Sequence, residues 1–88
     1  MNDLLLTIER RVDVLSRLKI GKTSLQDRIN SDIFPPPIKL GGARAVGWFQ
    51  HETTAMLSAM AAGRTKDEIK ALVTSIVEAR NGMPEVFK

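Results

Sequence analysis

The sequence predicts a mainly α-helical domain that carries a small β-hairpin. Three observations lead to this fold class: two short helical patterns either side of Gly21, two alternating segments either side of Gly41-Gly42, and two longer helical patterns after Phe49. Helix, turn, helix and basic hairpin follow one another in the order of a winged helix-turn-helix, with one extra helix at the C-terminus.

Length and composition are those of one soluble domain. The 88 residues are 43% hydrophobic and 26% charged, which allows a single small core. Without cysteine and with one histidine, a disulfide framework and a thiolate metal site are excluded, and a cytoplasmic protein is expected. The apolar run Leu4 to Leu6 is too short for a signal peptide or a membrane span.

Basic residues are concentrated in the first half of the chain. Residues 10–44 hold eight lysines and arginines against three aspartates, whereas from Trp48 onward five basic residues face five acidic ones. This placement predicts a surface for a polyanion in the first half, with an ordinary solvated basic surface as the alternative.

The first helix is predicted over residues Arg10 to Leu18, where Val14, Leu15 and Leu18 fall on one face. Gly21 follows it and is suited to a turn with an unusual backbone angle.

The second helix is predicted over Lys22 to Asn30 and is anchored by Leu25 and Ile29, four positions apart. Either Thr23 or Ser24 is expected to cap its start, because hydroxyl side chains accept the N–H groups that a helix leaves without partners.

A hairpin is predicted after the prolines Pro35 to Pro37, which cannot continue a helix. Residues Ile38 to Leu40 and Ala45 to Trp48 alternate inward and outward positions, with Gly41-Gly42 between them. Phe34 and Trp48 are expected to pack in the core beneath this hairpin.

Two helices are predicted to complete the fold. The first starts after Phe49 and ends at Gly63, with an apolar stripe made of Thr53, Met56, Leu57 and Met60. Thr65 and Glu68 have the spacing of a capping box, which begins a helix whose stripe from Ile69 to Val77 extends to Arg80.

The predicted organisation has three parts. Residues 1–63 form the winged helix-turn-helix DNA-binding domain, residues 64–82 form an amphipathic helix, and residues 83–88 form a tail. The amphipathic helix packs either on the same domain or on a second copy of the chain, as a homodimer.

The segment Gly21-Lys22-Thr23-Ser24 also resembles the end of a phosphate-binding loop of nucleotide hydrolases. That motif requires a glycine five positions before Gly21, where this chain has Ser16, and a buried strand before the loop, where this chain is helical in pattern. No other catalytic constellation is present: His51 stands alone near a helix start, and Asp67 with Glu68 complements a helix dipole. We therefore expect a protein that is not an enzyme.

Three pieces of the chain, in their order and spacing, are similar to a known family. They are Lys22-Thr23-Ser24-Leu25, the run from Phe34 to Gly41, and Arg44-Ala45-Val46-Gly47-Trp48. With them, the stretch from about Ile8 to Met60 resembles the AlpA family of phage-type regulators, which share the winged-helix fold of the MerR-like excisionases. Glu52, Ala55 and Leu57 also fall where the family's next helix has these residue types.

The resemblance implies a double-stranded DNA-binding regulator of transcription from a prophage or integrated mobile element, or a factor that acts directly in excision. The second helix would enter the major groove and the wing would reach the adjacent backbone or minor groove. No cofactor, metal, small-molecule ligand or membrane is expected as a partner. The expected contact residues are Lys22, Thr23, Ser24, Gln26, Asp27, Arg28 and Asn30 on the second helix, with Lys39 and Arg44 in the wing.

The chain departs from the family at the second helix. Gly21 replaces a serine cap, and Gln26 and Asp27 replace a common tyrosine and arginine, so that Asp27 must accept from a cytosine amine or be repelled by DNA. Arg28 falls on a usually apolar position and is expected to turn outward to phosphate. Asp27 and the modest net charge of +3 motivate a rival hypothesis, a protein-interaction adaptor that uses the C-terminal helix.

Overall fold

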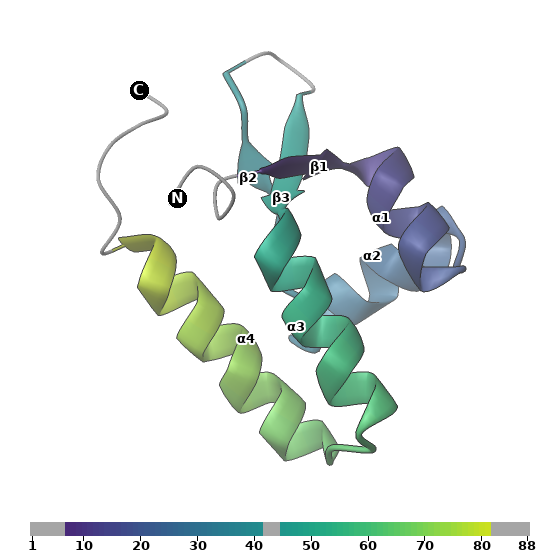
Figure 1. The fold of residues 1–88 in the computed structure, drawn as a ribbon, viewed down its shortest axis with the longest axis vertical. Helices are drawn as coiled ribbons and strands as arrows, with labels where there is room; N and C mark the ends of the chain where they lie inside the picture. Colours follow the sequence, from purple (N-terminus) through teal and green to yellow (C-terminus); the bar gives the residue numbers. More distant parts are fainter. Residues whose placement is uncertain (1–6, 42–44, 82–88) are drawn as a thin grey trace.

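The computed structural model describes residues 7–41 and 45–81, which form four helices and a three-stranded antiparallel sheet (Figure 1). The elements in chain order are β1 (Ile8–Arg10), α1 (Arg11–Leu18), α2 (Lys22–Asn30), β2 (Ile38–Lys39), β3 (Val46–Phe49), α3 (Gln50–Ala61) and α4 (Lys66–Asn81). The predicted fold class, mainly helical with a small sheet, is confirmed. Arg44 and the predicted tail of residues 83–88 lie outside the described residues.

The sheet has the strand order β1-β3-β2. Lys39 pairs with Val46, and the Leu40 N–H donates to the Ala45 carbonyl at 2.8 Å, as expected for the hairpin. Strand β1, which pairs Ile8 with Phe49, was not predicted. Three residues are too few to show a period of two, and their partner strand lies far along the chain.

Gly47 allows β1 to lie close to the middle of this sheet. A Cβ at that position would come within 2.7 Å of the Glu9 carbonyl oxygen and 2.9 Å of the Ile8 side chain. A larger residue there would therefore push β1 away from β3.

The turn between α1 and α2 differs from the prediction. Lys19, and not Gly21, has the left-handed backbone conformation, with φ 60° and ψ 40°. Gly21 is extended, with φ −89°, and is the N-cap of α2, without a side-chain cap. Thr23 and Ser24 lie inside the first turn and do not cap the helix, because the helix already begins at Lys22.

Helices α3 and α4 lie side by side, joined by a short turn (Figure 1). Gly63 has φ 72°, which fits its predicted role at the end of α3. The predicted capping box of α4 is confirmed: the Thr65 N–H donates to Glu68 Oε1 at 2.9 Å, and the Glu68 N–H donates to Thr65 Oγ1 at 3.2 Å.

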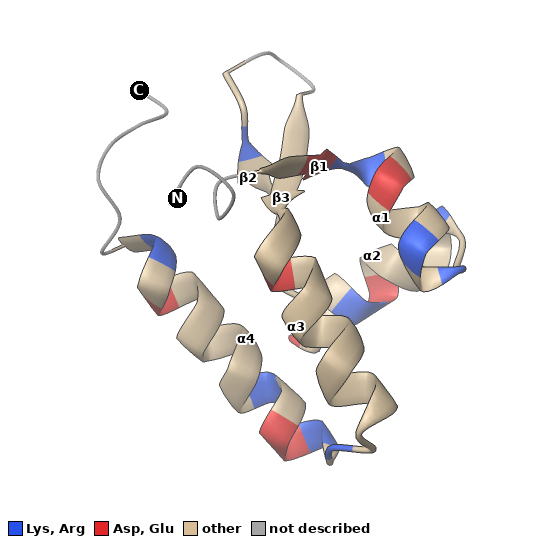
Figure 2. Ribbon diagram, viewed as in Figure 1, with Lys and Arg blue, Asp and Glu red and all other residues tan. Residues whose placement is uncertain are grey.

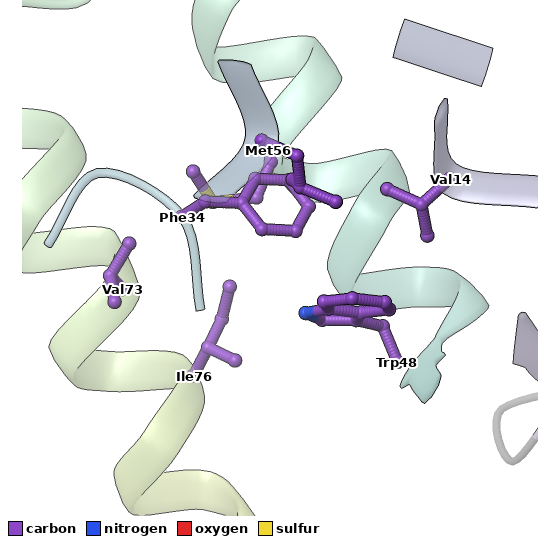
Figure 3. Close-up of a cluster of buried hydrophobic side chains, with 7 residues drawn as sticks. Val14, Phe34, Trp48, Met56, Val73 and Ile76 are labelled. Atoms are coloured by element: carbon purple, nitrogen blue, oxygen red, sulfur yellow. The ribbon is translucent and has the colours of Figure 1, made fainter. Parts of the chain in front are cut away.

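One core joins the four helices to the sheet (Figure 3). Its buried side chains come from α1, α2, the proline segment, β3, α3 and α4; they are Val14, Leu25, Phe34, Trp48, Met56, Val73 and Ile76. The rings of Phe34 and Trp48 meet edge to face at 5.9 Å, and the indole N–H donates to the Pro35 carbonyl at 2.9 Å. The predicted core positions of both aromatic residues are confirmed, and α4 adds the partly buried Ile69 and Leu72 to the same core.

Candidate nucleic-acid interface

Helix α2 is held to the core by one face and presents the other to solvent. Leu25 is fully buried, and Ile29 packs against the same core. This orientation leaves exposed the residues Lys22, Thr23, Ser24, Gln26, Asp27 and Asn30. Six of the seven predicted contact residues of this helix therefore lie on its accessible surface.

The start of α2 is electropositive. Its first turn contains no acidic residue, and its N-cap Gly21 offers no side-chain acceptor to the first N–H groups. These N–H groups and the Lys22 ammonium are exposed together at the positive end of the helix dipole. Such a helix start favours a phosphate oxygen as its partner.

The middle of the exposed face carries two amide side chains in contact. Gln26 Nε2 donates to Asn30 Oδ1 at 3.0 Å, one helical turn away. This bond restricts the rotamers of both amides before any ligand is bound. Asn and Gln side chains are the residue types that pair with the major-groove edge of adenine.

The prediction that Arg28 turns outward is wrong. Its guanidinium donates to the Met60 sulfur at 3.4 Å, and the residue is half-buried against α3. The long apolar stem of arginine can occupy a position at which an apolar residue would pack, which explains its place on the inner side of α2. Asp27, by contrast, is exposed and forms no ion pair within the described part of the chain.

Of the two residues predicted for a wing, the structure describes Lys39 and not Arg44. Lys39 is exposed on β2, beside Val46 of β3. Figure 2 shows basic segments on β2, at the junction of β1 and α1, and at the corner where α1 meets α2. The exposed Lys19 lies at that corner, three residues before Lys22.

Two partly buried arginines that raise the formal charge are paired with buried carboxylates. Both Glu9 carboxylate oxygens accept from Arg17 Nη1 at 2.8 Å, and Arg17 Nη2 donates to Thr54 Oγ1 at 2.8 Å. Arg80 donates to both oxygens of Glu52, at 2.9 and 2.7 Å, and to the Pro36 carbonyl at 2.8 Å. Sequence reasoning missed both pairs, because no local spacing connects their members.

The histidine and acidic side chains of the described residues form no candidate metal site. No group of three or more His, Asp or Glu side chains within this part of the chain could hold a metal ion. His51 is exposed and stacks on Phe49 with 5.5 Å between ring centroids. The Thr65 N–H bonded to its carboxylate lowers the pKa of Glu68, with a smaller effect from Arg64, which is the electrostatics of a helix cap.

No helix in residues 7–41 and 45–81 is both long and apolar enough to cross a bilayer. Comparison with family models, curated proteins and solved structures gave no significant match to this chain.

Proposed function

We propose that this protein is a sequence-specific double-stranded DNA-binding regulator of transcription from a prophage or integrated mobile element. Helix α2 enters the major groove, and the hairpin of β2 and β3 forms a basic wing on the adjacent backbone or minor groove. The fold is then a winged helix-turn-helix with α4 added, and the resemblance to the AlpA family supports the biological setting.

The observation that carries this proposal is the exposed face of α2. A helix that packs Leu25, Ile29 and the half-buried Arg28 against the fold presents its remaining face to solvent. This exposed face starts with Lys22 and continues with Gln26 and Asn30. Its N-terminal end is uncapped and lacks acidic residues. Phosphate contacts at a helix start and amides along its face are what a recognition helix requires.

Asp27, on the exposed face of α2, is expected to make the proposed binding selective for DNA sequence. A carboxylate beside DNA is repelled by the backbone unless it accepts a hydrogen bond, and the amino group of cytosine is the donor available in the major groove. Because Asp27 has no ion-pair partner in the described residues, its carboxylate is available for that bond. We therefore expect Asp27 to disfavour binding to most DNA sequences and to allow binding where a cytosine amino group meets its carboxylate.

Direct action in excision uses the same surfaces and is the first alternative. The adaptor hypothesis needs a docking surface on α4, but the apolar stripe of that helix contributes Val73 and Ile76 to the core. The exposed positions of α4 are polar or alanine, which makes that helix the weaker candidate for an interface.

The proposal is tested by fluorescence anisotropy of labelled duplexes taken from around the protein's own gene, with scrambled duplexes of equal length. Binding should prefer the native sequence and should weaken steeply as salt rises, because each neutralised phosphate releases counterions. Equal affinity for native and scrambled duplexes at low salt would rule out a sequence-specific regulator and leave the adaptor hypothesis.

A further inference from the structure

Two consecutive arginines stand at the junction of β1 and α1, outside the predicted contact residues. Arg10 is exposed, and its Nε donates to the Val46 carbonyl at 3.2 Å. The Arg11 guanidinium carbon lies 5.7 Å from the centroid of a Trp48 ring. Neither side chain forms an ion pair within residues 7–41 and 45–81.

Both guanidinium groups are held in place without being neutralised. An arginine has five N–H donors, and the bond from Nε of Arg10 leaves its two terminal nitrogens available. The Arg11 guanidinium lies over a Trp48 ring, and a cation–π contact of this kind leaves N–H donors for other partners. The nearby Asp13 carboxylate accepts from the Arg10 backbone N–H at 3.0 Å, where it caps α1.

Arg10 and Arg11 border an open depression whose lining is partly apolar. Arg10, Arg11, Val12 and Val46 line an open depression of about 350 Å³. Val12 is 70% exposed and is the large hydrophobic side chain that the described part of the chain leaves in solvent. An apolar side chain between two cations matches a deoxyribose next to its phosphate better than a free inorganic anion.

This depression continues the wing toward α1. Val46 pairs with Lys39 on one side, while on the other side Arg10 of β1 pairs with Gly47, the next residue of β3. Since neighbouring strands lie about 4.8 Å apart, the backbones of β1 and β2 are separated by roughly 10 Å across β3. The strands that carry Arg10 and Lys39 therefore flank β3 at neighbouring register positions.

We infer that Arg10 and Arg11 form a binding site for a DNA backbone phosphate, with Val12 against the adjoining deoxyribose. The site adds a backbone contact at the start of α1 to the contacts proposed for the wing and for α2. This inference rests on the proposed function, and it adds affinity for any duplex without adding sequence preference.

The test measures anisotropy of native and scrambled duplexes, over a range of salt, with the double variant Arg10→Gln, Arg11→Gln. We expect binding of both duplexes to weaken by the same factor, about tenfold at low salt, because phosphate contacts carry no sequence information. The slope of log affinity against log salt should fall in magnitude by about one to two.

Substitutions at Val12 test the site without removing a native contact. Val12→Glu adds a negative charge to the first turn of α1, where an acid is compatible with the helix dipole, and should weaken binding. Val12→Lys should tighten binding and steepen the salt dependence. The matched control is Lys70→Gln on the exposed surface of α4, which should leave both nearly unchanged.

The outcomes separate this inference from the proposed function. Native-sequence binding that is lost in Lys22→Ala but unchanged in the arginine double variant, in Val12→Glu and in Val12→Lys would overturn the phosphate site alone. An equal loss in Lys70→Gln would show a general charge effect and would also overturn it. Failure of the unmodified protein to bind any duplex would refute the proposed function before the site is reached.

Discussion

The arginines of this protein have different roles although their side chains are the same. Arg17 and Arg80 bind buried carboxylates, and Arg28 donates to Met60. Within the described residues, Arg10 and Arg11 keep guanidinium donors available beside the β2–β3 hairpin. The formal charge of residues 10–44 therefore overstates the charge accessible at the surface, because Arg17 is paired and Arg28 is half-buried. Burial and hydrogen bonding decide which cations take part in an interface.

Lys22 is predicted to be the strongest single phosphate contact of α2. Replacing it with alanine should weaken binding of native and scrambled duplexes alike and reduce the salt slope by about one, because one phosphate contact is lost. Lys22 is exposed, so the unfolding temperature should change little. Equilibrium anisotropy over salt, with circular dichroism as the folding control, measures both; an unchanged slope would remove Lys22 from the interface.

Thr53 is predicted to limit stability. Its side chain is fully buried, and its hydroxyl has no hydrogen-bond partner among the described residues. Thr53→Val keeps the shape and removes the unsatisfied group, which should raise the free energy of unfolding by about 1 kcal/mol. The matched control Thr54→Val removes the acceptor of Arg17 and should not stabilise. Urea unfolding that showed Thr53→Val to be less stable than the parent would contradict this account.

At the scale of elements, α4 is bound to the rest of the fold by charge as well as by apolar packing. Glu52 of α3 is 2% exposed, and the Arg80 side chain that pairs with it also reaches the Pro36 carbonyl before β2. The indole of Trp48 binds the neighbouring Pro35 carbonyl. The proline segment that leads into β2 is thus held from both α4 and β3.

Breaking this pair should destabilise the whole domain. Arg80→Met leaves the buried Glu52 carboxylate without its partner and should cost roughly 3–5 kcal/mol, a large part of the stability of a small domain. Adding Glu52→Gln should recover part of the loss, because the unpaired charge is removed. Thermal unfolding measures both variants against the exposed control Glu78→Gln, and an Arg80→Met midpoint equal to the control would show that the pair does not stabilise the fold.

The elements differ in how well local sequence predicts them. Helices α2, α3 and α4 have apolar residues at helical spacing, and clear signals bound them. A proline segment follows α2, Gly63 follows α3, and a capping box begins α4, so their bounds follow from the sequence. Strand β1 depends on a partner beyond two helices, and the left-handed Lys19 is forced by the path of the chain into α2. The exposed face of α2 can be predicted from the spacing of Leu25 and Ile29, which places both on the opposite side. The inward position of Arg28 cannot, because it depends on Met60, thirty-two positions away.

Charged side chains are distributed unevenly over the surface of the whole molecule. The molecule's largest dimension is 34 Å, close to the length of one turn of duplex DNA, so under the proposed function one copy would fit one half-site. Exposed cations gather on the side of α1, α2 and the sheet, while α4 presents mixed charge (Figure 2). A homodimer through α4 remains a prediction, and sedimentation equilibrium of the full chain would reveal it as twice the monomer mass.

The central claim, that DNA binds α2 and the wing, is tested most directly by mapping amide chemical shifts as a duplex from around the protein's own gene is added. The largest changes are predicted on Lys22 to Asn30, at Lys39, and at Arg10 to Val12, with the exposed face of α4 nearly unchanged. Changes confined to α4, with the amides of α2 unmoved, would contradict it.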